Sequence, residues 1–362
     1  MSETIRISVD AMGGDKGPRV VMHGARLALK ERKNTSFIFH GRQEELEPLL
    51  NEFPDLKPVS TIHHCETVIS MDEKPSQALR KGRGSSSMWA ALQSVKDGEA
   101  DVAISGGNTG ALMAMAIFCL RPVEGISRPA IAAIWPTLRS DIVVLDVGAT
   151  IDDNAQQLVD FSILGAALAR TLFDQESPTI GLLNVGSEDV KGLEEVKDAA
   201  QMLAGVSGAG FTYHGFVEGD DIGKGTVDVV VTDGFTGNIA LKTAEGTARQ
   251  VGTYLRLALS ADPVSKLGAV LAGRALNALR SKMDPRTVNG GVFLGLNGIV
   301  IKSHGGTDEV GVKSALGLAY EMARSHLMDK VAEGMRRFPR PAPTVSPVPA
   351  ATLEPQAEAK PA

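Results

Sequence analysis

The chain has 362 residues, of which 43% are hydrophobic and 22% are charged, so it is long and apolar enough to form a full globular core. Its formal net charge of −6 and its aromatic content of 4% argue against nucleic-acid binding, which usually needs a basic surface and side chains that stack on bases. The two cysteines, Cys65 and Cys119, predict reduced thiols without a disulfide framework. The N-terminal segment lacks an apolar stretch and no run could span a bilayer, so we expect a cytoplasmic protein.

Short apolar runs alternate with helical stretches along the chain. The runs lack polar alternation, which is typical of strands buried on both faces of a mainly parallel sheet. We expect strands at residues 5–10, 36–40, 100–105, 130–135, 141–146, 179–185, 227–232 and 298–302. We expect helices at residues 17–31, 85–96, 109–120, 155–173, 193–203, 237–259 and 308–331. This order predicts a doubly wound α/β fold with a ligand crevice at the carboxyl ends of the strands.

Four glycine-containing turns each follow a predicted strand: Asp10–Asp15, Ser105–Gly110, Asp146–Thr150 and Asp233–Asn238. Glycine lets backbone N–H groups approach an anion, and a helix that begins after such a turn adds its positive end. Any single turn needs glycine for structural reasons alone, but four that carry Asp, Asn and Thr favour one crevice for phosphate or another oxyanion. The candidate binding residues in these turns are Asp10, Gly13, Gly14, Gly106, Gly107, Asn108, Thr109, Asp233, Gly234 and Gly237.

Three further polar residues follow predicted strands and could complete such a site. Lys191 would supply the cation that a phosphate site without a metal needs, although a loop lysine is more often simply solvated. Asn238 would lie in the first turn of a helix, where its amide can face an anion, cap the helix, or do both. His304, beside Lys302 and Ser303, could act on the substrate or serve as a structural hydrogen-bond partner, and the residues leave both roles open.

Two motifs suggest a metal or a nucleotide only superficially. His63-His64-Cys65-Glu66 alternates across a strand and has no second ligand cluster at zinc spacing. Gly205–Gly210 follows a predicted helix and lacks the G-x-G-x-x-G spacing, and the sequence contains no Walker A motif. We therefore expect no metal and no cofactor.

Residues 262–283 form a basic amphipathic segment in an otherwise acidic chain, with apolar residues at helical spacing. Such a helix can contact an anionic membrane or an acidic protein partner. A dimer-forming or core helix with a solvated face fits the pattern about as well. The candidate contact residues are Leu267, Leu271, Arg274, Arg280 and Lys282.

We expect residues 1–338 to form a single catalytic α/β unit that includes this basic segment. Residues 339–362 contain seven of the 18 prolines and almost no large apolar side chains. This composition cannot form a core and predicts a disordered tail rich in proline and alanine.

The motifs, taken in order, resemble those of the bacterial phosphate acyltransferase family. The resemblance covers about residues 5–331 and rests on the four turns together with Leu294–Gly298 and Lys302–Gly305. That family makes acyl phosphate from long-chain acyl carrier protein thioesters and inorganic phosphate, an early step of phospholipid synthesis. The resemblance implies a three-layer α/β/α fold like that of isocitrate and isopropylmalate dehydrogenases. It also implies a homodimer and peripheral association with the inner face of the cell membrane, with the next acyltransferase of the pathway as a further partner.

By motif, the resemblance assigns the catalytic pair to Lys191 and Asn238. Lys191 would hold phosphate, and Asn238 would stabilise the tetrahedral oxyanion that forms when phosphate attacks the thioester carbonyl. His304 or Asp233 could orient groups or shuttle a proton. Three alternatives remain: a phosphotransacetylase-like enzyme that uses a coenzyme A thioester, a decarboxylating dehydrogenase on the same fold, and a non-catalytic membrane-bound scaffold.

Overall fold

The computed structural model describes residues 4–337, apart from residues 152, 206–209, 283, 285, 287 and 288 and the side chains of residues 281 and 282. The strands are β1 (Ile5–Asp10), β2 (Thr35–Gly41), β3 (Ser60–His64), β4 (Val102–Ser105), β5 (Ala130–Trp135), β6 (Ile142–Leu145), β7 (Thr179–Leu183), β8 (Thr212–Val217), β9 (Val229–Val231), β10 (Gly291–Leu294) and β11 (Ile299–Lys302). The helices are α1 (Pro18–Glu31), α2 (Gln43–Asn51), α3 (Pro75–Gly82), α4 (Ser87–Lys96), α5 (Thr109–Leu120), α6 (Ala155–Phe173), α7 (Glu194–Ala204), α8 (Gly219–Lys224), α9 (Gly234–Ser260), α10 (Pro263–Leu271), α11 (Gly273–Lys282), α12 (Glu309–Arg324) and α13 (Leu327–Arg337). The predicted tail at 339–362 lies outside the described residues.

The eleven strands of the described part form one sheet in the order β3-β2-β1-β4-β11-β10-β5-β6-β9-β7-β8. The first five strands in this order pair parallel with one another, and so do the last four. Between these groups, β10 pairs antiparallel with β11 and β5, and β5 pairs antiparallel with β6. The three successive reversals make the two parallel groups run in opposite directions.

This reversal corrects the expectation that all four glycine turns lie at one edge of the sheet. The turns after β1 and β4 lie at one edge, and the turns after β6 and β9 lie at the other. The strands are short, however. Lys302, the last residue of β11, pairs with Gly291 of β10, which pairs with Ala133 of β5, and Ala133 pairs with Val144 of β6, so Lys302 and Val144 lie at the same level of the sheet. Since β6 ends one residue later, at Leu145, and a strand rises about 3.3 Å per residue, the carboxyl ends of β11 and β6 are offset by only roughly 3 Å along the strand direction.

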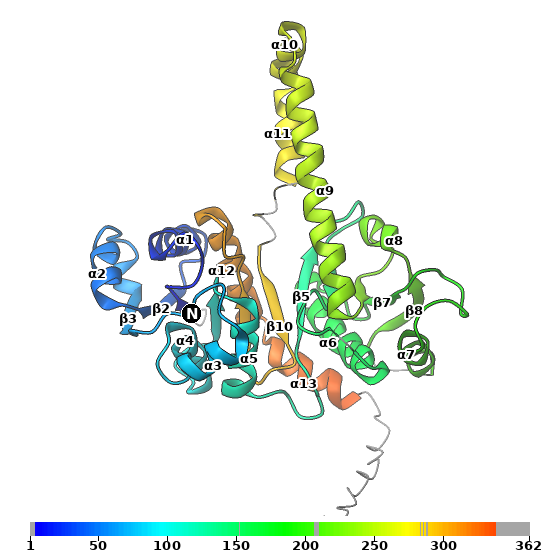
Figure 1. Ribbon diagram of the computed structural model, residues 1–362, viewed down its shortest axis with the longest axis horizontal. Coiled ribbons are helices and arrows are strands. Elements are labelled where there is room, and N and C mark those ends of the chain that lie inside the picture. The colour runs from blue at the N-terminus through cyan, green and yellow to red at the C-terminus, as the bar shows by residue number, and fades with distance from the viewer. Residues whose placement is uncertain are drawn as a thin grey trace, which may run out of the picture.

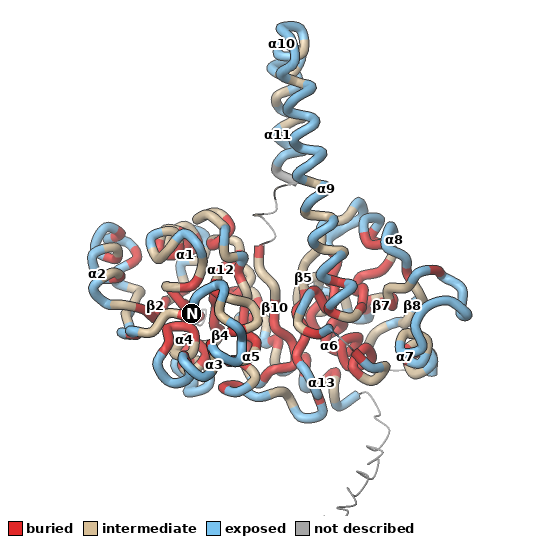
Figure 2. The backbone as a smooth tube through the Cα atoms, viewed as in Figure 1, coloured by how far each residue is buried: buried red, intermediate tan, exposed pale blue. Residues whose placement is uncertain are grey.

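Helices cover both faces of the sheet and bury a separate core on each, which confirms the predicted three-layer α/β/α architecture (Figures 1 and 2). One core joins the sheet to α1, α6, α7, α12 and α13, and the other joins it to α3, α4, α5 and α8. Leu241 of α9 packs against the second core, so α9 and α5 lie on the same face of the sheet. Val300 belongs to this second core and Ile301 to the first, so alternation along β11 places Lys302 on the face of α5 and α9.

Helices α9, α10 and α11 project from the body as an arm whose surface is almost entirely exposed (Figures 1 and 2). The segment predicted to be helical at 262–283 consists of two helices, α10 and α11, rather than one. Asp262 separates α9 from α10, because its carboxylate accepts the N–H groups of Val264 and Ser265 and caps the new helix. Within the described chain, no helix is both long and apolar enough to cross a bilayer.

Candidate functional site

Three turns meet at the carboxyl ends of β1, β4 and β11. The Asp15 N–H donates to the Gly305 carbonyl over 2.9 Å, and the Ser303 N–H donates to the Ser105 carbonyl over 2.9 Å. A Cβ added at Gly106 would lie 3.2 Å from the Gly13 carbonyl oxygen, so the first two turns are in close backbone contact. The structure therefore brings together the candidates Asp10, Gly13, Gly14, Gly106, Gly107, Asn108, Thr109 and His304 in what we call the first turn cluster.

The buried side chain of Asp10 connects two turns of the first turn cluster through hydrogen bonds. Its Oδ2 accepts a 2.6 Å hydrogen bond from Ser105 Oγ. Ser105 Oγ in turn accepts the Gly107 N–H over 3.0 Å. Burial raises the pKa of the Asp10 carboxyl, opposed by these hydrogen bonds. This geometry gives Asp10 an organising role, and its predicted contact with substrate stays a prediction.

Asn108 and Thr109 begin α5 in the same cluster. Asn108 Oδ1 accepts the Ala111 N–H over 3.0 Å, as a helix cap does. The other end of the amide donates to the Met71 and Glu73 carbonyls over 2.7 and 2.9 Å. Both the oxygen and the NH₂ group of the Asn108 amide are therefore hydrogen-bonded, and these bonds attach the loop before α3 to the start of α5.

His304 and Lys302 bring basic side chains to the same cluster. The His304 N–H donates to Asn289 Oδ1 over 3.0 Å, and His304 Nδ1 accepts the Gly306 N–H over 3.3 Å. Burial lowers the pKa of the imidazole, and the charges of Lys242 and Lys302 add to this effect. Lys302 Nζ donates to the Ser303 carbonyl and, over 3.5 Å, to that of Gly106.

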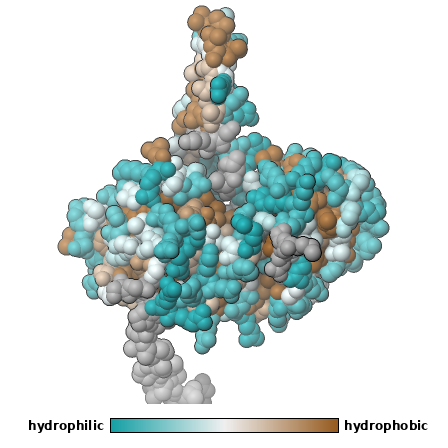
Figure 3. All heavy atoms as spheres, turned by 180° about the vertical axis from the view of Figure 1, so that it is seen from behind, coloured by the Kyte–Doolittle hydropathy of each residue, from teal (hydrophilic) through white to brown (hydrophobic). Residues whose placement is uncertain are grey.

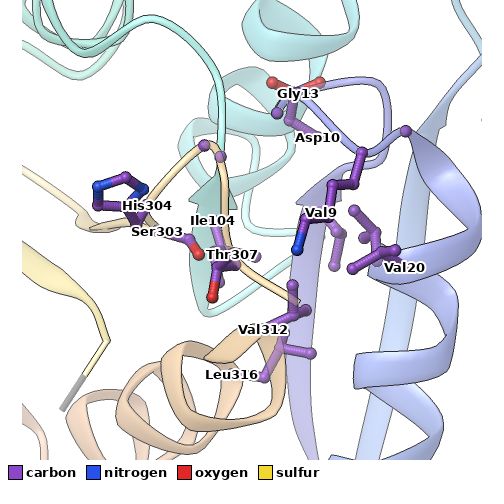
Figure 4. Close-up of a pocket in the computed structure, with 16 residues that line it drawn as sticks. Val9, Asp10, Gly13, Val20, Ile104, Ser303, His304, Thr307, Val312 and Leu316 are labelled. Atoms are coloured by element: carbon purple, nitrogen blue, oxygen red, sulfur yellow. The ribbon is translucent and has the colours of Figure 1, made fainter. Parts of the chain in front are cut away.

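A small, partly open pocket with a volume of about 30 Å³ lies beside the first turn cluster, on the side of α1 and α12. Figure 4 shows Asp10, Gly13, Ser303 and Thr307 on one side of it and the apolar side chains from α1 and α12 on the other. The volume is enough for roughly two water molecules. The cavity is therefore too small for an acyl chain.

A second turn cluster lies at the carboxyl ends of β6 and β9 and is built around the fully buried Asp146. Its carboxylate accepts four backbone N–H groups and one hydroxyl, from Ile131, Gly148, Ala149, Thr150 and the Thr150 side chain, over 2.9–3.1 Å. Burial raises the pKa of Asp146, and these donors oppose that effect. The sequence singled out this turn, but the candidate set did not include the aspartate that shapes it.

The candidates Gly234 and Gly237 are the positions where α9 starts against the Asp146 turn. A Cβ at Gly237 would lie 1.8 Å from the Asp146 carbonyl oxygen, and one at Gly234 would lie 2.4 Å from that of Thr150. Asp233 caps the helix, since its Oδ1 accepts the Thr236 N–H over 2.8 Å. These three residues therefore position the N-terminus of α9, where the Gly234 N–H donates to Thr150 Oγ1 and Asp153 Oδ2.

Asn238 is exposed in the first turns of α9 and lies against Gly148, where a Cβ would sit 3.5 Å from the Asn238 side chain. Lys191 follows β7, the strand beside β9, so it emerges at the same edge of the sheet. Lys191 is half-exposed and forms a 2.8 Å ion pair with Glu188, whose carboxylate raises the pKa of the lysine. No hydrogen bond joins Lys191 to Asn238 in this part of the described chain.

One face of α9 carries Asn238 and two charged residues. Lys242 follows Asn238 by four residues, and Glu245 follows by seven, so all three share a face of the helix. Burial lowers the pKa of both His304 and Lys302, and the charge of Lys242 adds to each of these effects.

The arm carries the remaining candidates away from both clusters. Leu267 and Leu271 are 61% and 80% exposed on α10, and Figure 3 shows apolar side chains gathered at the tip of the arm. Arg274 and Arg280 lie on α11, and the side chain of Lys282 is outside the described residues. Among the residues that the structure describes, no three His, Cys, Asp or Glu side chains are grouped as a metal site requires.

Comparison with known proteins identifies the family. A family model described as "Fatty acid synthesis protein" matches residues 5–330. The chain is 61% identical over 326 residues to a phosphate acyltransferase of Chelativorans sp. (strain BNC1), covering 90% of this chain and 93% of that protein. The chain belongs to the phosphate acyltransferase family. A second member, from Agrobacterium fabrum, is 58% identical over 94% of this chain and 98% of its own length. The expectation of an acyltransferase from this family is confirmed, and the protein is an enzyme.

Solved structures support the fold of this phosphate acyltransferase family member. A phosphotransacetylase from Streptococcus pyogenes superposes with a TM-score of 0.57 at 18% identity, covering 90% of this chain and 94% of that chain. A 4-hydroxythreonine-4-phosphate dehydrogenase from Klebsiella pneumoniae gives a TM-score of 0.52 at 13% identity, with 90% and 99% covered. At such identities the likeness concerns the fold alone.

Lys242 was not among the candidate residues predicted from the sequence. A signal was nevertheless present, because Lys242 lies one helical turn after Asn238 in a helix that was itself predicted. Lys302 is a neighbour of the candidate His304 in the sequence, but it was not itself a candidate. Its partial burial and its position opposite α9 depend on the reversal at β10 and β5, which no local pattern reveals.

Proposed function

We propose that the protein forms acyl phosphate from inorganic phosphate and a long-chain acyl group carried as a thioester on acyl carrier protein. The observation that carries the proposal is the position of Asn238 and Lys191 after the neighbouring strands β9 and β7, at one exposed edge beside the N-terminus of α9. The family description and the names of the relatives support the same chemistry. Residues 1–338 would act as one catalytic unit, because the eleven strands of the described part form one continuous sheet.

The proposed reaction is direct attack by phosphate on the thioester carbonyl. Lys191 is charged at neutral pH, since Glu188 raises its pKa, and offsets the repulsion between phosphate and other anionic groups. A phosphate oxygen forms the new bond to the carbonyl carbon, and the Asn238 amide donates to the oxyanion of the tetrahedral intermediate. The intermediate collapses with loss of the thiolate, whose conjugate thiol has an unperturbed pKa of about 8.5, so it needs little general-acid help.

The arm supports the proposal of a homodimer that associates peripherally with an anionic membrane. Val251, Tyr254 and Leu257 on α9 are 48–61% exposed, a pattern that in soluble proteins marks a contact surface. At the tip, Val264 and Val270 of α10 are 78% and 77% exposed beside the cations of α11. We assign the α9 surface to the second subunit and the tip to the inner face of the cell membrane, with acyl carrier protein and the next acyltransferase as the further partners.

A phosphotransacetylase-like reaction with a coenzyme A thioester is the second candidate, favoured by the shared fold of the Streptococcus pyogenes enzyme. It uses the same attack by phosphate and differs only in the donor. A membrane-bound scaffold without activity would leave the organised turn clusters without a use.

The test is detection of acyl phosphate by mass spectrometry after the protein is mixed with phosphate and long-chain acyl carrier protein. We expect product only when phosphate is present, a lower rate with acyl coenzyme A, and at least a tenfold lower rate for Lys191→Ala. Lys197→Ala is the matched control, because Lys197 forms a similar ion pair with Glu194 three residues away on α7. Absence of product from both donors would contradict the function, and a normal rate for Lys191→Ala would remove the lysine from the mechanism.

A further inference from the structure

A groove with a volume of about 550 Å³ lies between α4 and the end of β3, at the edge of the sheet. No residue assigned to either turn cluster lines it, so it is separate from the site of the proposed reaction. A volume of this size accepts a small organic molecule. The described residues that line it include Trp89, Gln93 and Ser94 from α4, and His40, His63 and Cys65 from the sheet and the loop after it.

His40 is a buried polar side chain among these lining residues, with an exposed fraction of 1%. Its Nε2 lies 2.9 Å from Ser8 Oγ and 3.4 Å from Ser94 Oγ. Ser94 Oγ donates its own proton to Glu99 over 3.0 Å and can therefore only accept from His40, which favours the ring proton on Nε2. The other nitrogen, Nδ1, has no partner among the described residues, so it is left as an acceptor for a ligand that donates.

The charged side chains that line the groove are all acidic: Glu66, Asp97 and Glu99. Asp97 accepts the Gln93 amide over 2.9 and 3.0 Å, and Glu99 accepts the Ser94 hydroxyl. These are neutral donors, and neither carboxylate has a cation within 4 Å in the described part of the chain. Burial lowers the pKa of His40 to about 3, so this imidazole is neutral at pH 7 and adds no positive charge.

Two arginines lie near the groove, and both are engaged by carboxylates. Arg6 donates to the Gly98 carbonyl over 2.7 Å and forms a 2.6 Å ion pair with Asp101. Arg42 lies 3.9 Å from Glu66 and offsets the charge of that carboxylate. The uncompensated negative charge of the groove is therefore at the C-terminal end of α4, where Asp97 and Glu99 lie.

The opposite end of the groove is aromatic. Trp89 precedes Asp97 by eight residues on α4, which corresponds to about 12 Å along the helix. The Arg83 guanidinium lies 5.8 Å from the centre of the Trp89 ring, so this end does not favour a second cation. The groove thus has carboxylates at one end, an unpaired acceptor along its length and an indole at the other end.

We propose that this groove is a binding site for an organic amine. The ammonium group would be held by Asp97, Glu99 and His40 Nδ1, since its three donors suffice for these acceptors. The apolar part of the amine would lie along α4 toward Trp89. Anions of the same shape are excluded, because the two carboxylates would repel them. The proposal does not depend on the proposed acyl transfer.

The experiment uses 4-phenylbutylamine as the probe and 5-phenylpentanoate, which has the same ring and number of methylene groups, as its anionic counterpart. The chain contains two tryptophans, so Trp135→Phe leaves Trp89 as the only one and its fluorescence reports on the groove. Calorimetry on the unaltered protein gives the dissociation constant independently. We expect saturable binding of the amine, and binding of the carboxylate at least tenfold weaker.

Two variants test the contacts. Asp97→Asn combined with Glu99→Gln, and separately His40→Phe, should each raise the dissociation constant of the amine at least tenfold. Glu44→Gln combined with Glu47→Gln is the control, because it removes two exposed carboxylates from α2, where Glu47 accepts the Gln43 amide four residues away just as Asp97 accepts that of Gln93. This control should bind the amine within twofold of the unaltered protein.

Circular dichroism checks that each variant is folded. If His40→Phe does not fold, the carboxylate variant decides the test, since Asp97 and Glu99 are exposed. No saturable binding of the amine below about 10 mM would overturn the proposal. Equal binding of amine and carboxylate probes, or equal losses in the two double variants, would overturn it too. None of these measurements uses turnover, so their failure is distinct from a failure of the proposed function.

Discussion

At the scale of single residues, the glycines of the turn after β9 have a packing role that the motif alone did not reveal. The sequence indicated that Gly234 and Gly237 expose N–H groups to an anion. The structure shows that they also let the start of α9 approach the Asp146 turn, where a Cβ at Gly237 would overlap the Asp146 carbonyl. An exposed Asn238 beside Gly148 is the result of this close approach.

Gly237→Ala should lower the free energy of unfolding by roughly 3 kcal/mol, because the added methyl group must push α9 away from the Asp146 turn. Gly246→Ala is the matched substitution in the same helix, where a Cβ would meet nothing within 4 Å. It should raise stability by about 1 kcal/mol, since alanine favours a helix interior over glycine. Urea unfolding monitored by circular dichroism measures the free energy of unfolding of both variants. Equal changes for the two substitutions would show that a methyl group at position 237 does not displace α9 from the Asp146 turn.

At the scale of elements, strongly patterned segments were predictable and exposed or interrupted ones were not. The predicted bounds of β1, β5, α5 and α6 agree with the structure, because these elements are uniformly apolar or carry clear caps such as Asn108 and Asn154. Strands β3 and β8 were missed because polar residues such as His64 and Thr212 leave them half-exposed at the sheet edges. The helix predicted at 308–331 is divided into α12 and α13 at His326, whose φ of 53° ends a helix.

The arm, formed by α9, α10 and α11, exposes several large apolar side chains. Leu267→Glu combined with Leu271→Glu should reduce co-sedimentation with anionic lipid vesicles at least tenfold, because two exposed leucines at the tip lose favourable burial and gain charge. Leu138→Glu is the control, since Leu138 is 90% exposed in the loop between β5 and β6, outside the arm. Unchanged vesicle binding together with a change in oligomeric state would assign α10 to subunit contact instead.

At the scale of the whole molecule, the position of the site depends on the antiparallel strands at the centre of the sheet. The local sequence patterns predicted that turns follow β1, β4, β6 and β9. They did not predict that the turns after β1 and β4 lie at one edge of the sheet and those after β6 and β9 at the other. That arrangement depends on the pairing of β10 with β5, two strands that are far apart in sequence. Helix α9 lies on the same face of the sheet as Lys302, although the strands β9 and β11 that lead to Asn238 and Lys302 run in opposite directions.

In the proposed mechanism, the acyl carbonyl reacts at the face of α9 that carries Asn238. The most direct measurement is kcat for acyl phosphate formation by Asn238→Ala at saturating phosphate and acyl carrier protein thioester, compared with Gln250→Ala, which removes another exposed amide from the same helix. We predict a fall in kcat of about 10²–10³ for Asn238→Ala, the usual cost of losing one oxyanion donor, with unchanged thermal stability and a normal kcat for Gln250→Ala. A kcat for Asn238→Ala within threefold of the unaltered protein would contradict this account.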